Sequence, residues 1–214
     1  MKRKNKNQLF ISIVGTTIGV LIAFVLNNWN ISRIEKNESE RVLANIVNEV
    51  KLNNTLLLKS YESASKTIPS LSKLVLKYER GEKLLMTAQE MKEYQKEFPN
   101  KFFVADSIKT LTKGVWEYKG KYDFNPDIFL HFSLNESAWN SAIAVGILNN
   151  IQFEKIKPLE EVYSLQSQVK KQSEKLMDAF DIGMKQYIKV LNNLVQYEKL
   201  LIDKYERFTT NKKQ

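Results

Sequence analysis

The chain has 214 residues, 33 basic and 24 acidic side chains, a net charge of +9, and 43% hydrophobic residues, a composition typical of a folded globular protein. The absence of cysteine excludes a disulfide framework and thiolate metal sites, and a single histidine excludes metal sites with two histidine ligands. Only seven glycines and four prolines leave few turns, which disfavours an all-β fold.

A basic arm and a long uncharged segment open the chain. Residues 1–8 contain four basic and no acidic side chains, and Leu9 to Leu26 are eighteen residues without a charge. A helix of that length spans about 27 Å, close to the thickness of the hydrocarbon region of a bilayer. The segment ends in residues typical of the membrane interface: Asn27, Asn28 and Trp29. We therefore predict a cytoplasmic arm over 1–8 and a transmembrane anchor over 9–29.

Two alternatives to an uncleaved anchor are weaker. The apolar run is longer than the hydrophobic region of most signal peptides, and no small-x-small cleavage site follows it. A buried soluble helix would leave the basic cluster before the run unexplained. Because basic residues mark the cytoplasmic side of a first span, the expected location is the cell (inner) membrane. The protein would be single-pass, with its C-terminal domain extracytoplasmic or periplasmic.

Three small residues recur every four positions in the apolar run: Gly15, Gly19 and Ala23. Such a ridge lets two membrane helices approach closely, which predicts self-association or packing on another membrane protein. The alternative is the ordinary abundance of small residues in membrane helices. Nucleic acid is not an expected partner, because four of the basic residues lie in the arm and lysines outnumber arginines 28 to 5.

Residues 30–208 are predicted to form one extracytoplasmic helical-bundle domain, followed by a polar tail over 209–214. Residues 31–66 contain no glycine or proline and carry an apolar stripe, which predicts a stalk helix continuous with the anchor. Pro69 is expected to bend or end that helix, and a second helix is expected over 69–80.

Short elements are predicted in the middle of the chain. Thr87 and Glu90 have the spacing of a capping box, which predicts a helix to about Phe98. Residues 104–113 are expected to form another short helix, with Gly114 following its C-terminus.

The segment 115–132 is rich in aromatic residues and has the pattern of a small hairpin around Gly120. Four rings in it are the best candidate for a ligand or partner surface: Trp116, Tyr118, Tyr122 and Phe124. The alternative, which we favour, is that these rings fill the interior beneath a long loop, since aromatic side chains dominate core burial.

A second capping-box pattern, Ser133 with Glu136, predicts a helix over about 134–149. Small residues spaced by four predict close packing of this helix against a neighbour: Ala138, Ala142 and Gly146. Pro158 suits the first turn of a final long helix that reaches Phe208.

A seven-residue repeat runs along that final helix, with most of its positions apolar or aromatic and four exceptions: Gln166, Ser173, Gly183 and Lys204. Two long amphipathic helices cannot bury their stripes alone, so antiparallel pairing is expected. The predicted fold class is all-α: an N-terminal transmembrane helix continuous with a stalk helix, then an antiparallel helical bundle with a small aromatic-rich loop or hairpin.

The run IGVLIAFVLNNWNISRIEKNESERVLANI resembles a group of bacterial single-pass membrane proteins of unknown function. In that group an apolar span ends in Asn-x-Trp or Asn-Asn-Trp and precedes a charged helix. The later runs SAWNSAIAVGILNNI and LEEVYSLQ, the latter with Leu159 and Tyr163, resemble its second half. The resemblance covers the first 50 residues and roughly 133–170. It implies a membrane-anchored helical protein and no activity.

Signatures of enzymes and cofactor sites are absent from the sequence. It contains no phosphate-binding loop, dinucleotide fingerprint or nucleophile elbow, so no catalytic, cofactor or metal residue is assigned. His131 would need Asp127 or Glu136 beside it to act as a base. A partly buried structural histidine is the preferred interpretation.

The sequence therefore favours a non-enzymatic, membrane-anchored accessory or scaffold subunit of an envelope complex, which binds through its transmembrane helix and its bundle. Expected partners are the bilayer and either further copies of the chain or another membrane protein. One alternative is an extracytoplasmic sensor that binds a ligand at 98–132 and relays through a partner's transmembrane helix. Another is an extracytoplasmic enzyme whose carboxylate site has no sequence signature.

Overall fold

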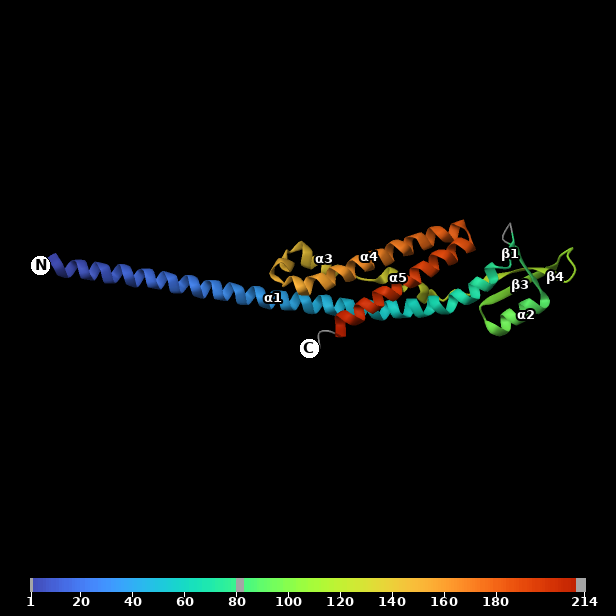
Figure 1. Cartoon of the computed structure of the whole chain (residues 1–214), viewed down its shortest axis with the longest axis horizontal. Coiled ribbons are helices and arrows are strands. Elements are labelled where there is room, and N and C mark those ends of the chain that lie inside the picture. The colour runs from blue at the N-terminus through green and yellow to red at the C-terminus, as the bar shows by residue number, and fades with distance from the viewer. Residues whose placement is uncertain (1, 80–82, 211–214) are drawn as a thin grey trace. The chain divides into compact units, whose positions relative to one another are not determined.

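A computed structural model describes the backbone of residues 2–79 and 83–210, and the side chains of 16–77 and 83–210. Most of the described chain is helical, as predicted, and it also contains an antiparallel sheet that the all-α prediction did not include (Figure 1).

The chain divides into two compact units. The first unit comprises Met1–Ile46 and Ser137–Ile156, and the second comprises Val47–Glu136 and Lys157–Gln214. The long helices α1 and α4 contribute residues to both units.

Helix α1 runs without interruption from Lys2 to Val75. This confirms one continuous helix through 31–66, but the prediction that Pro69 bends or ends it is wrong, because the helix continues for six further residues. A proline inside a helix costs about 3 kcal/mol or more. Leu71 and Leu74 are only 1% and 2% exposed, and burial of each leucine contributes about 1.5–3 kcal/mol, which offsets that cost.

The predicted anchor begins in residues 9–15, which lie outside the part of α1 whose side chains are described. Among the described residues, no helix is both long enough and apolar enough to cross a membrane. From residue 16 to residue 38, every side chain of α1 is exposed.

In the first unit, α3 (Ser137–Ala144) is followed by a short 3-10 helix, η2 (Ile147–Asn150). The predicted helix over 134–149 is thus shorter, and Gly146 between the two elements adopts φ +69°.

The predicted capping box of Ser133 with Glu136 is wrong as well. Ser133 belongs to an earlier 3-10 helix, η1 (Pro126–Ser133), and the Glu136 carboxylate accepts a hydrogen bond from Gln166 instead.

In the second unit, α4 (Phe153–Ile182) and α5 (Met184–Thr210) form a hairpin (Figure 1). The prediction of one helix from Pro158 to Phe208 is therefore wrong at two points. The helix begins before Pro158, which lies inside α4, and the chain reverses at Gly183. Gly183 has φ +133°, a conformation that residues with a side chain rarely adopt, so this glycine permits the reversal.

Three rows of buried side chains with alternating spacings of four and three make the helical core of the second unit. The row on α1 is Val50, Asn53, Leu57, Ser60, Ala64, Thr67, Leu71 and Leu74. The row on α4 is Leu159, Val162, Gln166, Val169, Ser173 and Leu176. The row on α5 is Tyr187, Leu191, Leu194, Glu198, Leu201 and Tyr205. This spacing is that of a coiled coil, and each row contains polar members.

Within the described residues, four antiparallel strands lie in the order β1-β2-β4-β3. They are β1 (Tyr78–Glu79), β2 (Lys83–Thr87), β3 (Phe102–Lys109) and β4 (Val115–Tyr122). The predicted helix over 104–113 is therefore wrong. The hairpin turn lies at 110–114, where Gly114 has φ +80°, and not around Gly120.

Gly120 lies within β4, where a Cβ atom would come within 2.2 Å of the carbonyl oxygen of Phe103 on β3. Only glycine permits this close approach of the two strands.

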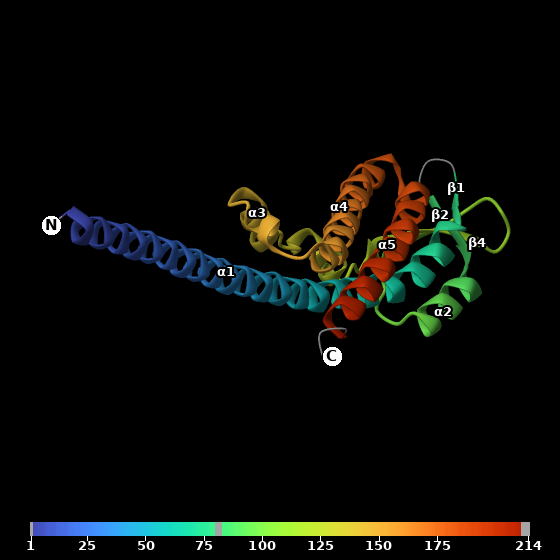
Figure 2. The ribbon, with the colours of Figure 1, turned by 60° about the vertical axis from the view of Figure 1, so that its left-hand side comes forward.

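Helix α2 (Ala88–Glu97) joins β2 to β3 and covers one face of the sheet (Figure 2). It begins with the predicted capping box, which is confirmed: the Thr87 hydroxyl accepts from the Glu90 N–H, and the Glu90 carboxylate accepts from the Thr87 N–H. A second core lies between the sheet, α2 and the end of α1: Leu74, Leu84, Met86, Met91, Tyr94 and Phe102.

Candidate functional site

The residues of the predicted membrane segment are exposed wherever they are described. Gly15 lies outside the described side chains, and Gly19 and Ala23 are exposed on α1. A Cβ atom added to Gly19 would meet nothing within 4 Å. Asn27, Asn28 and Trp29 of the predicted interface are exposed too, and the Arg33 guanidinium lies 5.8 Å from the centre of the Trp29 ring.

The rings of the candidate ligand surface are all half-buried: Trp116, Tyr118, Tyr122 and Phe124. Tyr118 and Tyr122 pack against the core between the sheet and α2. Trp116 lies opposite Met86 in the β2–β4 pair, and Met86 is buried.

Phe124 packs against the α4–α5 hairpin, with its ring centre 6.4 Å from that of Phe180 and 5.9 Å from that of Tyr187. The Tyr122 ring lies 4.8 Å from Phe124, and its hydroxyl hydrogen-bonds with Ser70 of α1. These rings connect the end of β4 to three helices, which supports the interpretation that they fill the interior.

The three small residues of the predicted close-packing face differ in environment. Ala142 is 1% exposed, and Ala138 is half-buried. Gly146 lies past the end of α3 and is exposed.

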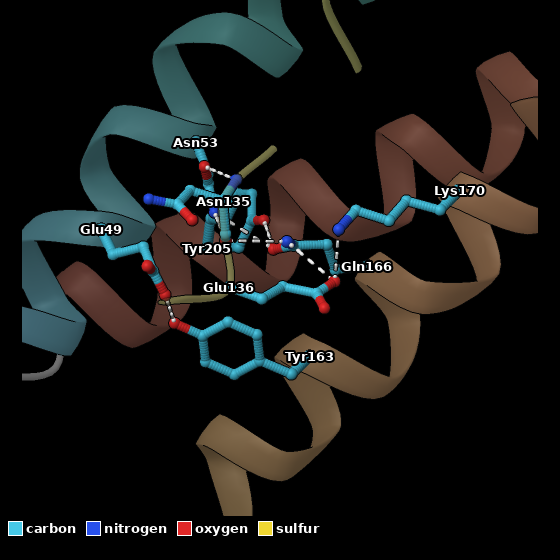
Figure 3. Close-up of polar contacts among 8 residues, drawn as sticks. All are labelled: Glu49, Asn53, Asn135, Glu136, Tyr163, Gln166, Lys170 and Tyr205. Carbon is cyan, nitrogen blue, oxygen red and sulfur yellow. Dashed lines mark hydrogen bonds and ion pairs between the residues drawn. The ribbon is translucent and has the colours of Figure 1, made fainter. Parts of the chain in front are cut away.

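An extensive buried polar arrangement in the second unit centres on Gln166, whose side chain is 0% exposed (Figure 3). Its carbonyl oxygen accepts from the Asn53 amide at 3.2 Å and from the Tyr205 hydroxyl at 2.5 Å. Its amide nitrogen donates to the Asn135 carbonyl at 3.0 Å and to the Glu136 carboxylate at 3.2 Å. A carboxamide has two donors and one acceptor oxygen, so both of its ends are fully used.

Asn53 of α1 pairs with the backbone of Asn135, the second residue after η1. The Asn53 amide donates to the Asn135 carbonyl and its oxygen accepts from the Asn135 N–H, each at 2.8 Å. Lys170 of α4 forms an ion pair of 2.9 Å with Glu136. We call Asn53, Asn135, Glu136, Gln166, Lys170 and Tyr205 the Gln166 network. It joins α1, α4 and α5 to the segment after η1 (Figure 3).

Burial controls the ionisation of three core tyrosines. Burial and the hydrogen bond that Tyr163 donates to Glu49, at 2.6 Å, raise the pKa of Tyr163 far above its ordinary value of 10. Burial likewise raises the pKa of Tyr205, and burial, with Tyr122 nearby, raises the pKa of Tyr187 to about 12.

We therefore expect the second unit to lose stability above pH 10. The folded state holds Tyr163, Tyr187 and Tyr205 neutral, so their stabilisation is complete below the ordinary pKa of 10 and is lost as pH rises towards the folded pKa. Each group contributes a loss of about 1.4 kcal/mol per pH unit in that window. Tyrosinate absorbance and circular dichroism, recorded together as the pH is raised, should show that these three buried tyrosines ionise only as the protein unfolds.

Tyr187→Phe is the control for this pH dependence, because it removes one late-titrating group and should make the alkaline loss of stability less steep. Ionisation of all tyrosines near pH 10 without unfolding would contradict the expectation.

A second buried polar group, which we call the His131 cluster, consists of Ser60, His131 and Glu198, each 0% exposed. The Ser60 Oγ lies 2.7 Å from Glu198 Oε1, 2.9 Å from the Ile128 carbonyl oxygen and 3.1 Å from His131 Nδ1. The His131 Nδ1 lies 3.2 Å from Glu198 Oε1. Both the Ser60 hydroxyl and the His131 Nδ1 thus lie within hydrogen-bond distance of the same carboxylate oxygen, Glu198 Oε1.

The His131 cluster contains the residue types of a Ser-His-acid catalytic triad but not its geometry. In such a triad the serine and the acid lie on opposite ring nitrogens, so that the imidazole transfers the proton of the serine. Here both lie on Nδ1, and Nε2 has no partner among the described residues. This arrangement tethers η1 to α1 and α5 and does not activate Ser60 as a nucleophile.

Sequence reasoning identified Gln166 as a polar exception in the repeat but missed its partners. Asn53 lies 113 residues away from Gln166 in the chain, and Ser60 lies 138 residues from Glu198. The available signal was the spacing of Asn53, Ser60 and Thr67, which recur every seventh residue along the apolar stripe of α1.

The described residues contain no group of three or more histidine and carboxylate side chains placed to hold a metal ion. Comparison with models of protein families, with curated proteins and with solved structures found no match to this chain.

Proposed function

We propose that the protein is a non-enzymatic accessory or scaffold subunit, anchored in a membrane by the N-terminal part of α1. The observation that carries the proposal is an apolar surface on α1 that no other part of the described chain covers. Its members between residues 18 and 26 are each 49–67% exposed: Ile18, Val20, Leu21, Ile22, Phe24, Val25 and Leu26.

The distribution of these side chains favours a bilayer over a single partner helix. At 3.6 residues per turn, these side chains cover about two thirds of the circumference of the helix, and the uncharged Gly19 and Ala23 lie in the remaining arc. A helix that is apolar all round is stable only when it is enclosed, whereas one neighbouring helix covers one side. Each fully buried side chain of this size contributes about 1.5–3 kcal/mol.

The uncharged run itself supports the same proposal. It extends from Leu9 to Leu26, follows four basic residues, and precedes Trp29 with its neighbour Arg33. In this arrangement the basic arm stays cytoplasmic and the bundle lies on the other side of the membrane. The Gly15–Gly19–Ala23 ridge would then contact a second transmembrane helix, from another copy or another membrane protein.

The test is a crosslinking experiment in native cells with Gly15→Ile and Gly19→Ile combined. The full-length protein is extracted in a mild detergent, and all recovered proteins are identified by mass spectrometry. We expect the double variant to remain in carbonate-washed membranes but to lose its crosslinked partner, because branched side chains separate the two helices. Gly19 has open space around it, so its replacement leaves the chain's own fold intact.

The matched control is Leu21→Phe, which adds bulk two residues along, about 200° around the helix. This variant should retain the partner. If the partner still co-purifies with the glycine variant, the small-residue ridge is not the contact surface. If carbonate releases the unmodified protein from membranes, α1 does not anchor it.

A further inference from the structure

We propose that a groove between α4 and α5 binds an anionic carbohydrate. The groove has a volume of about 580 Å³, and none of its lining residues belongs to the buried rows of α4 and α5. Two lysines, one from each helix, line it: Lys175 and Lys189. None of its lining residues is acidic, so the groove favours a negatively charged ligand.

Four carboxamide side chains line the same groove: Gln172, Gln186, Asn193 and Gln196. Within the described part of the chain, none of them hydrogen-bonds with another residue, and neither lysine of the groove has an ion-pair partner. Each amide offers donors beside an acceptor oxygen, a combination that pairs with neighbouring hydroxyl groups of a sugar. The lysines would hold a carboxylate of the same ligand by charge-assisted hydrogen bonds.

A second hollow of about 280 Å³ extends the groove along α4. It shares Gln172, Lys175 and Tyr197 with the first and adds Lys171, one helical turn before Lys175. Its lining also includes the acidic Glu174 and Asp178, which balance its two lysines, so the excess of positive charge lies in the larger hollow. The shared residues make a continuous path that suits several linked sugar units, with Tyr197 providing an aromatic surface between the two hollows.

The lining argues against a docked helix as the occupant. A helix that binds in a groove presents an apolar face to apolar walls. Only Val190 and Leu200 are aliphatic among the residues that line the larger hollow, and Val190 is itself 8% exposed. Of the other seven lining residues, four carry an amide group and two carry an ammonium group, which matches a hydroxylated anion better.

Calorimetric titration of the full-length protein, in a neutral detergent at low salt, with an oligomer of galacturonic acid tests this proposal. We expect saturable binding that Lys175→Gln with Lys189→Gln weakens at least tenfold, because two charge-assisted hydrogen bonds are lost. Gln172→Leu with Gln196→Leu should also weaken binding several-fold without changing the charge. The control pair Lys185→Gln with Lys199→Gln makes the same charge change on α5 outside the groove and should bind as the unmodified protein does.

Polyglutamate and a neutral maltose oligomer separate charge from sugar recognition. Binding of the galacturonate oligomer at least tenfold tighter than both supports the proposal. Equal binding of polyglutamate, equal binding of the groove variants, or no binding of galacturonate at millimolar concentration overturns it. These outcomes do not depend on whether α1 anchors the protein in a membrane.

Discussion

His131→Leu is expected to lower the free energy of unfolding by about 1–3 kcal/mol, because it removes one hydrogen-bonding partner from a fully buried polar cluster. The substitution leaves the fully buried Glu198 carboxylate with Ser60 as its remaining neighbour, since Glu198 Oε2 already has no partner among the described residues. It also removes the contacts of the η1 imidazole with Ser60 of α1 and Glu198 of α5. Chemical denaturation in a neutral detergent, followed by circular dichroism, measures the loss.

A double variant, in which Glu198→Leu is added to His131→Leu, removes the buried carboxylate as well. Because replacing both members of a buried pair by apolar groups is often close to neutral, His131→Leu with Glu198→Leu should be more stable than His131→Leu alone. Glu206→Leu, an exposed position on the same helix, controls for the added leucine and should change stability by less than about 0.5 kcal/mol. A double variant less stable than His131→Leu would show that the cluster is not a coupled unit.

The sequence predicted the helices well where periodicity and local capping agree. The stripe of 31–66 and the capping box at Thr87 depend on residues close together in the chain, and both are present. The break at Gly183 could not be derived in this way. A glycine inside a helix costs only about 1 kcal/mol, so the sequence is compatible with one long helix or with two. The reversal depends on α5 packing back on α4 and α1.

Strand β3 shows how a distant partner overrides a local pattern. Val104, Ile108 and Leu111 have spacings of four and three, which is why residues 104–113 resemble a helix. In the structure these three side chains are exposed, and the backbone of β3 pairs with β4 instead. The glycine that permits the close strand approach, Gly120, lies in the partner strand, so no window around β3 contains the signal.

The polar residues of the core were predictable in kind but not in pairing. Gln166 and Ser173 interrupt the repeat of α4, and Asn53 and Ser60 interrupt that of α1. The structure places Asn53 beside Gln166, whereas the Ser173 hydroxyl donates to the Val169 carbonyl of its own helix. A polar residue at a coiled-coil core position fixes helix register at a cost in stability, and two polar layers restrict the register more than one.

Gln166→Leu is the second substitution with a large expected effect, a loss of about 2–4 kcal/mol in the free energy of unfolding. Leucine fills similar space but offers no hydrogen bonds, so the buried Tyr205 hydroxyl loses its acceptor and Asn53 loses one of two partners. Each buried polar group left unpaired costs about 1–3 kcal/mol. Gln168→Leu, two residues away and exposed, makes the same chemical change on α4 and should alter stability by less than about 0.5 kcal/mol.

A double-mutant cycle with Tyr205→Phe separates two contributions to the loss of stability: the unpaired Tyr205 hydroxyl and the change in packing at residue 166. In the unmodified protein, Tyr205→Phe should destabilise, because it removes a donor to Gln166 at 2.5 Å. In the Gln166→Leu background, the same change removes a hydroxyl that has no acceptor, so it should be neutral or stabilising. The two effects should therefore differ by about 0.5–3 kcal/mol, the range of coupling between residues in one network. Equal effects in both backgrounds would mean that Gln166 contributes by packing and not by its hydrogen bonds.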